Sequence, residues 1–283
     1  MAKKAWTKFP YPDKTYDYAG ASLKKAWPDL HRGDCEPFPD ETWVKSVVAS
    51  HPKLDPKMPP AKAAEALQTA WRAYHSGDFA EAVEQGAALG PLGYNAANKA
   101  ANIYATYLEG DDSRQLEIFQ ESAARAEKLQ AIAKDFPNAF YFHASALGRY
   151  GQGISVAKAL AMGLGGKIKA SLDKALALEP RHAEAHIALG AYNAEVVAKV
   201  GGLVAGLTYG ASKDAAVKHY EEARRLTPDS AIARIEYANG LMALFGKSKL
   251  AAATKLYQEA AASKPRNAME RLDQQAAIEE LED

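Results

Sequence analysis

The 283-residue sequence predicts an all-α fold, built as a stack of antiparallel helical hairpins behind an arm rich in proline and aromatic residues. From residue 61 onward, the strong helix formers Ala, Leu, Glu and Lys dominate, and apolar residues recur at helical spacing. No run of β-branched residues alternates with polar ones, as it would in a strand. Short breaks at glycine or proline separate the helical stretches, so consecutive helices are expected to be antiparallel neighbours.

The first part of the chain differs from the rest. More than half of the prolines fall within the first sixty residues and prevent long helices there. Aromatic residues such as Trp6, Phe9 and Trp27 lie between them, and each has a large apolar area to bury. We therefore expect residues 1–58 to form an extended arm with a short helix near 40–50, packed on a body of residues 59–283.

The body contains an internal repeat. The segments "IKASLDKALALEPRHAEAHIALG", "AAVKHYEEARRLTPDSAIARIEYANG" and "AATKLYQEAAASKPRNAMERLDQQ" align with one another, and "LQAIAKDFPNAFYFHASALG" is an earlier member. In each of the three, a large residue is followed three positions later by an alanine and five positions after that by a proline. These residues are Leu172, Ala175 and Pro180; Tyr220, Ala223 and Pro228; and Tyr257, Ala260 and Pro265.

This pattern resembles the tetratricopeptide repeat (TPR), over roughly residues 61 to 265. The resemblance implies a solenoid in which small residues let two antiparallel helices approach, a large residue fills the gap, and proline ends the second helix. It also implies a concave groove, lined by the first helix of each pair, in which partners bind. The segments are more distantly similar to the TPR component of bacterial tripartite (TRAP) transporters and to the regulators of microtubule dynamics. An unrelated helical bundle is the alternative.

The repeat is irregular. Successive prolines at 137, 180, 228 and 265 are 43, 48 and 37 residues apart, whereas a TPR period is about 34 residues. The excess predicts insertions near 151–166 and 199–212, both rich in glycine. Gly202, Gly206 and Gly210 would share one helix face, which favours close approach of another backbone. Three roles remain open for the insertions: packing against each other, lining a pocket, or self-association.

Composition excludes several classes of partner and location. Lys plus Arg and Asp plus Glu number 35 each, so there is no concentrated basic charge of the kind that binds nucleic acid. No apolar run reaches the roughly 20 residues of a membrane span, and the N-terminus lacks the apolar core of a signal peptide. Cys35 is the only cysteine, so no disulfide framework is expected and a bacterial cytoplasmic location fits best.

No motif of an enzyme is present. The sequence contains no phosphate-binding glycine loop, no serine-nucleophile motif and no paired cysteines. His182 and His186 have the spacing of a two-histidine metal site. We expect His182 instead to lie at a helix start, as a cap or in solvent, and His186 to be packed between helices. We therefore expect neither catalysis, nor a cofactor, nor a metal.

The sequence favours a non-catalytic TPR-type scaffold that engages a protein or peptide in its groove. The alternative is a protein that binds a small apolar or amphipathic ligand in a pocket lined by the glycine-rich insertions. Polar groups in apolar helices and groove positions give the candidate binding residues, which are Phe142, Arg149, Gln152, Asn193, Glu195, Tyr209, Arg234 and Asn239. Internal pairing of Arg149 or Arg234 with Glu195 or Glu236 would also explain these charges.

Overall fold

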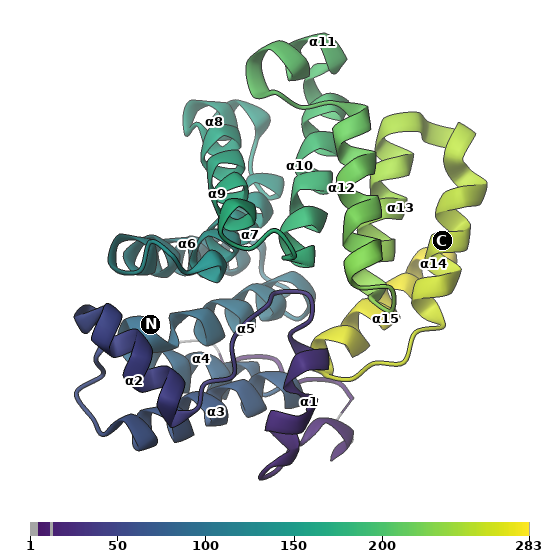
Figure 1. Cartoon of the computed structure of the whole chain (residues 1–283). Coiled ribbons are helices and arrows are strands. Elements are labelled where there is room, and N and C mark those ends of the chain that lie inside the picture. The colour runs from purple at the N-terminus through teal and green to yellow at the C-terminus, as the bar shows by residue number, and fades with distance from the viewer. Residues whose placement is uncertain (1–4, 12–13, 283) are drawn as a thin grey trace. The chain divides into compact units, whose positions relative to one another are not determined.

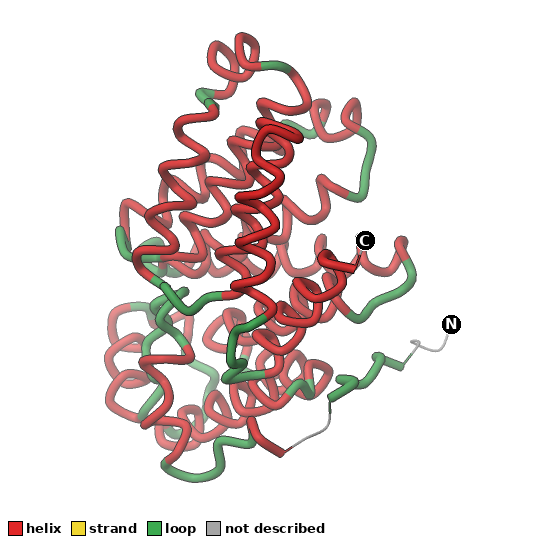
Figure 2. The backbone as a smooth tube through the Cα atoms, turned by 90° about the vertical axis from the view of Figure 1, so that its right-hand side faces the viewer, coloured by secondary structure: helices red, strands yellow, loops and turns green. Residues whose placement is uncertain are grey.

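A computed structural model describes residues 5–11 and 14–282, and within these ranges every regular element is helical (Figures 1 and 2). The all-α prediction is confirmed. The chain forms two compact units. Unit 1 contains the described residues of Met1–His31 and Glu36–Val156, and unit 2 contains those of Arg32–Cys35 and Ala157–Asp283. The division therefore falls within the first insertion.

In unit 1 the described part of the arm contributes two α-helices and the body contributes five, together with short 3-10 helices. The arm holds η1 (Lys14–Tyr16), α1 (Ser22–Leu30), α2 (Glu41–Ser50) and η2 (Pro52–Leu54). The body holds α3 (Pro60–Ser76), α4 (Phe79–Ala88), η3 (Gly90–Gly93), α5 (Tyr94–Tyr107), α6 (Asp112–Ile132) and α7 (Pro137–Gln152). Each of α3 to α6 packs against the next helix along the chain, and α5 also packs against α3 and α7. Helix α2 lies where a short helix was expected.

Unit 2 begins at the insertion that contains α8 (Val156–Ala161). It continues through α9 (Leu164–Leu178), α10 (Ala183–Val200), α11 (Gly202–Val204), η4 (Ala205–Tyr209) and α12 (Lys213–Leu226). It ends with α13 (Ala231–Phe245), η5 (Gly246–Lys249), α14 (Leu250–Ala261) and α15 (Ala268–Glu282). Helix α10 packs against α12 and α13, and α14 packs against α13 and α15. This is the hairpin arrangement that the repeat predicts.

Local sequence signals set the helix boundaries. Asp78, Asp111 and Ser212 each accept a hydrogen bond from a backbone N–H in the first turn of the helix that follows them. Pro137 occupies the first position of α7, where a missing N–H costs nothing. Gly77 ends α3 with a φ of 90°, a left-handed conformation that glycine adopts without strain.

One buried tyrosine shows how closely the hairpins of unit 2 approach. Tyr220 of α12 is 1% exposed and lies between α10 and α13. A Cβ added at Gly190 would lie 2.7 Å from Tyr220 Cδ1, and one at Gly240 would lie 2.5 Å from Cε2, on the opposite edge of the ring. Tyr220 also stacks on Tyr237, with ring centroids 5.2 Å apart. A large side chain thus fills the gap that glycines leave between helices.

The glycines of the second insertion have a different role from the one predicted. A Cβ at Gly202 or Gly206 would meet nothing within 4 Å, so no backbone among the described residues packs closely on either. The expectation that these two glycines form a close-packed helix face is wrong within the described chain. Gly201 (φ 78°) and Gly210 (φ 61°) instead adopt positive φ at the two ends of the α11–η4 segment. Glycine is needed here to turn the chain out of α10 and back into α12.

The described residues contain neither a membrane-spanning helix nor a cluster of metal ligands. No helix among them is long and apolar enough to cross a membrane. Within the same ranges, no group of three or more His, Cys, Asp and Glu side chains is arranged to hold a metal ion.

Candidate functional site

In unit 1, side chains of helix α3 bind main-chain carbonyl groups of the arm. The guanidinium of Arg72 donates to the carbonyl oxygens of Tyr18 and Gly20, each at 3.2 Å. Gln68 Nε2 donates to the carbonyl of Pro39 at 3.0 Å. These bonds go to main-chain groups, two of them in a stretch that turns at positive φ (Tyr18 and Gly20).

Aromatic and histidine rings anchor α1 on α3. Trp27 is 4% exposed, and its indole N–H donates to the carbonyl of Glu36 at 2.7 Å. Its ring stacks on His31 (3.9 Å between centroids) and meets Trp71 edge-on (5.7 Å). His31 and His75 are both buried, with their Nε2 atoms 3.2 Å apart. Sequence analysis did not assign this cluster, although Trp71 and His75 are four residues apart and so share a helix face.

A buried carboxylate joins the arm to two further helices. Glu36 is only 8% exposed. The Nδ2 of Asn95, in the first turn of α5, donates to both of its oxygens at 3.3 and 3.1 Å. The Nδ2 of Asn138, in the first turn of α7, donates to Oε2 at 2.5 Å. Two side-chain amides thus share the charge of this buried carboxylate.

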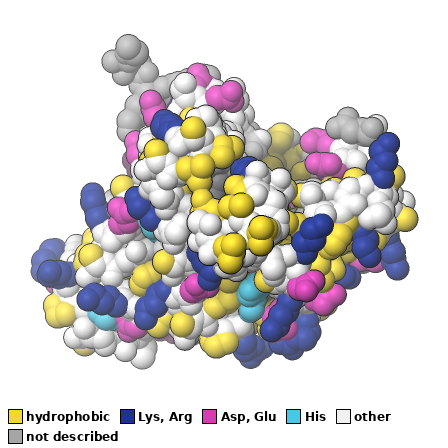
Figure 3. Space-filling view, turned by 90° about the horizontal axis from the view of Figure 1, so that it is seen from above, with side chains coloured by type: hydrophobic (Ala, Val, Ile, Leu, Met, Phe, Trp, Pro, Cys, Tyr) yellow, Lys and Arg dark blue, Asp and Glu magenta, His cyan; other side chains and the backbone are white. Residues whose placement is uncertain are grey.

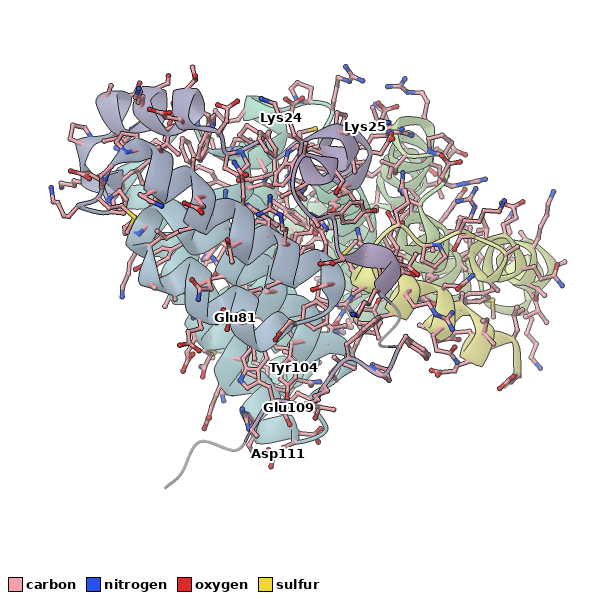
Figure 4. All side chains as sticks on the ribbon, turned by 90° about the horizontal axis from the view of Figure 1, so that it is seen from below. Lys24, Lys25, Glu81, Tyr104, Glu109 and Asp111 are labelled. Carbon is pink, nitrogen blue, oxygen red and sulfur yellow. The ribbon has the colours of Figure 1, made fainter. Side chains whose placement is uncertain are left out.

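Trp6 and Thr7 of the arm lie on α5. Trp6 stacks on Tyr104 with ring centroids 3.9 Å apart, and the N–H of Thr7 donates to the Tyr104 hydroxyl at 3.1 Å. That hydroxyl donates to Glu109 Oε2 at 3.0 Å, and Arg114 lies 3.2 Å from the same oxygen. Figure 4 shows Tyr104, Glu109 and Asp111 together at the C-terminal end of α5. The surface formed by α3, α5 and α7, hereafter the unit-1 face, therefore already holds the arm of its own chain.

The predicted binding residues on α7 differ in exposure. Phe142 is 2% exposed and belongs to the core. Arg149 is half-buried and Gln152 is exposed, and Arg149 Nη1 donates to Gln152 Oε1 at 3.2 Å. Of this set, only the two polar residues have side chains outside the core.

On α10, the predicted residue Asn193 is used internally. It is 3% exposed, donates to the carbonyl of Leu189 at 2.8 Å, and accepts from the N–H of Ser212 at 3.0 Å. It thereby fixes the end of the second insertion to α10. Glu195, one turn from Lys199 and half-buried, lies 3.2 Å from that ammonium group.

Tyr209 of the second insertion packs against the first insertion. Its ring carbons lie 3.3 to 3.4 Å from the position a Cβ would occupy at Gly165. Its carbonyl accepts from the Tyr192 hydroxyl at 3.4 Å. The two glycine-rich insertions are therefore in contact, and Tyr209 is half-buried between them.

On α13, Arg234 is bound within unit 2. It donates to Glu259 Oε2 on α14 at 3.2 Å and to the carbonyls of Ser230 and Pro228 at 2.9 and 2.5 Å. Internal pairing was one explanation for this charge, but the carboxylate is that of Glu259. Asn239 is exposed, and its Oδ1 accepts from the Tyr257 hydroxyl.

The histidines of unit 2 do not form the spaced pair that the sequence contains. His182 is fully buried and caps α10, accepting at Nδ1 from the N–H of Ala185 at 3.0 Å. His186 instead meets His219 of α12, with their Nδ1 atoms 2.9 Å apart. Burial lowers the pKa of both His186 and His219. For His219, burial together with the neighbouring His186 lowers the pKa to about 4.

Cys35 is not set up as a nucleophile. Burial, with the nearby Glu179 and Asp34 carboxylates, raises the pKa of its thiol to about 12. The thiolate, which is the reactive form, is thus disfavoured at neutral pH.

Among solved structures, the chain is similar to TTC0263, a thermophilic TPR protein of Thermus thermophilus. The TM-score is 0.55 at 14% sequence identity, covering 76% of this chain and 98% of that one. No family model matches the sequence, and no curated protein matches it. At this identity the likeness shows the fold alone, and that fold is all-α and TPR-like.

Proposed function

We propose that this protein is a non-catalytic TPR-type scaffold that binds an extended segment of a protein partner across the first helices of its hairpins. One observation supports the proposal: the unit-1 face holds the arm, a segment of coil, turns and short helices, through contacts of the kind that also bind peptides. Arg72 and Gln68 bind main-chain carbonyls, Asn95 and Asn138 bind a carboxylate, and Trp27 is an aromatic anchor.

Because the arm covers the unit-1 face, we assign the partner to the surface formed by α10 and α13, hereafter the unit-2 face. Glu195 and Glu236 lie on these two helices, and both carboxylates raise the pKa of the buried Tyr220 phenol after the larger effect of burial. Glu195 pairs with Lys199 at 3.2 Å, a partly exposed ion pair that a partner's lysine or arginine can replace. Acidic side chains on both helices favour a partner that carries such a residue.

Two other candidate residues fit this role. Asn239 is exposed on α13, and its oxygen already accepts from Tyr257. Its amide N–H groups are therefore what it offers to a partner's carbonyl. Arg234 is held by Glu259 and two carbonyls, so it keeps α13 and α14 in register instead of contacting the partner.

Selection of phage-displayed random peptides on the full-length protein tests the proposal. We expect selected peptides to be enriched in Lys or Arg and to bind with micromolar dissociation constants in fluorescence anisotropy. Glu236→Gln combined with Asn239→Ala should weaken binding at least tenfold, whereas Gln258→Ala, an exposed position on α14, should leave it unchanged. Peptides that bind both variants equally, or a selection that enriches nothing, would refute the assignment.

The proposal requires neither a cofactor nor a metal. We keep the cytoplasm as its place of action, since the single cysteine offers no disulfide to a protein in an oxidising compartment. A small-ligand pocket walled by the insertions is less well supported, because the two leucines of the second insertion, Leu203 and Leu207, point to solvent at 77% and 82% exposure.

A further inference from the structure

The second insertion of unit 2 exposes an unusual set of apolar side chains. Leu203, Val204 and Leu207 lie in α11 and η4, and Leu160 lies in α8 of the neighbouring insertion; their exposures are 77%, 47%, 82% and 52%. These four residues are called the apolar tip below. Figure 3 shows hydrophobic side chains gathered at this end of the unit. Large leucines this exposed cost free energy in water and indicate a surface that is covered in use.

The backbone holds the apolar tip in a defined shape. Gly201 and Gly210 turn the chain at positive φ on either side of it. Between them, Ala205 is fully buried, and its carbonyl accepts from the N–H of Ala211 at 3.1 Å. Tyr209 packs on Gly165 of the first insertion. The inner side of the segment is therefore anchored while its leucines face outward.

Only basic charges flank the apolar tip in sequence. No acidic residue occurs between Asp135 and Asp173, or between Glu195 and Asp214. Within unit 2 these two stretches contain Lys158, Lys167, Lys169, Lys199 and Lys213, of which Lys213 donates to the carbonyl of Leu244 at 2.7 Å. Lys169 and Lys199 pair with Asp173 and Glu195 one turn away. Such exposed pairs are weak, so both lysines can exchange to another anion.

We infer that the apolar tip inserts into the surface of an anionic lipid bilayer. Leucines of a short lobe can reach the boundary between headgroups and acyl chains while the surrounding lysines contact the headgroup phosphates. The protein would lie on the membrane without crossing it. The partner-binding face of α10 and α13 is not needed for this contact.

A second copy of the chain fits the apolar tip less well. Two copies meeting at this surface would bring lysines against lysines. The tip has four apolar side chains, whereas a stable protein interface uses about 20–30 residues on each side. Charge and size therefore both favour lipid over self-association.

Flotation of the full-length protein with vesicles tests the inference. We expect binding to vesicles of phosphatidylcholine with 30 mol% phosphatidylglycerol, and weak binding to phosphatidylcholine alone. Leu203→Ser with Leu207→Ser should lower the partition coefficient on the order of a hundredfold, since each buried leucine contributes about tenfold or more. Lys167→Glu should lower it by about tenfold or more, because about fivefold is lost with each lysine near the surface and an acidic charge is added.

Leu250→Ser is the matched control, since Leu250 is a 52% exposed leucine on α14 outside the apolar tip. It should bind vesicles as the wild type does. Equal binding to neutral and anionic vesicles, or no loss in the double variant, would overturn the inference. So would a dimer in analytical ultracentrifugation that the double variant abolishes, because the occupant would then be a second copy. Normal vesicle binding by Glu236→Gln/Asn239→Ala would separate this result from the fate of the peptide-binding proposal.

Discussion

Replacing Gly240 with alanine is the most direct test of how the hairpins of unit 2 pack. The added methyl group would lie 2.5 Å from Tyr220 Cε2, 2.8 Å from its hydroxyl oxygen and 2.9 Å from Cζ. Ordinary contacts between carbon atoms are about 3.5–4.0 Å. The methyl group therefore overlaps the ring by about 1 Å, and one of the two must move.

The Tyr220 ring is blocked on its opposite edge and on one face. Its opposite edge is against Gly190, where a Cβ would lie 2.7 Å away, and one face stacks on Tyr237. Overpacking of this kind costs about 1–3 kcal/mol, while alanine in place of a helical glycine returns about 0.5–1 kcal/mol. We therefore expect Gly240→Ala to lower the free energy of unfolding by about 1–2 kcal/mol.

Urea unfolding followed by circular dichroism measures this loss as a lower midpoint at unchanged slope. Gly148→Ala is the matched control, because it is also within a helix but its added Cβ meets nothing within 4 Å. That variant should be more stable than the wild type by about 0.5–1 kcal/mol. If Gly240→Ala behaves like Gly148→Ala, Tyr220 does not fill a rigid gap, and the account of hairpin packing fails.

Two further predictions concern the backbone and pH. Gly201→Ala should destabilise the protein by about 1–3 kcal/mol in urea unfolding. The reason is that the backbone angles at Gly201, φ 78° and ψ 154°, lie in a region open essentially to glycine alone. The neighbouring Gly202→Ala should change stability little, since its added Cβ meets nothing within 4 Å. The pKa of His219 falls from 6.5 to about 4 on folding, so the unfolded chain takes up the proton first. Stability should therefore be lost as the pH falls from about 6.5 towards 4, by about 1–2 kcal/mol allowing for partial exposure. Melting curves of His219→Gln should show a smaller dependence on pH over this range, and an unchanged dependence would contradict the assignment.

The sequence was sufficient to predict the fold because its signals are local and repeated. Helix formers, proline breaks and the spacing of Tyr220 and Pro228 act within one hairpin, so each can be interpreted without knowing the tertiary structure. The glycine spacing of the second insertion was misleading for the same reason. Gly202 and Gly206 satisfy the four-residue pattern of a packing face, but the backbone conformation at Gly201 and Gly210 decides the structure.

The candidate site was only partly predictable, because its contacts join residues far apart in the chain. Nothing near Glu36 in the sequence indicates that Asn95 and Asn138 bind its carboxylate. Likewise, Arg234 was expected to be a binding residue or the partner of Glu195 or Glu236, whereas Glu259 of the next helix pairs with it. Whether a polar side chain in a repeat helix faces a partner or a neighbouring helix depends on the register between hairpins, which a single sequence does not show.

Glu36 offers a test of how firmly the arm occupies the unit-1 face. Glu36→Ala removes a buried carboxylate and leaves the amides of Asn95 and Asn138 without this acceptor, at a cost of about 2–4 kcal/mol. Glu36→Gln keeps one oxygen and should lose less. Because α3 to α7 pack on one another without the arm, we expect the arm to open locally before these helices unfold.

Limited proteolysis should detect that opening as faster cleavage within residues 14–40 of Glu36→Ala, with the body of unit 1 still protected. Lys62→Ala, an exposed position on α3, should be cleaved at the wild-type rate. If cleavage of Glu36→Ala is no faster than that of the wild type, the carboxylate does not hold the arm. If the arm and the body are cleaved together, the arm is a structural part of unit 1, and its contacts could no longer support the idea that this type of surface recognises a separate peptide.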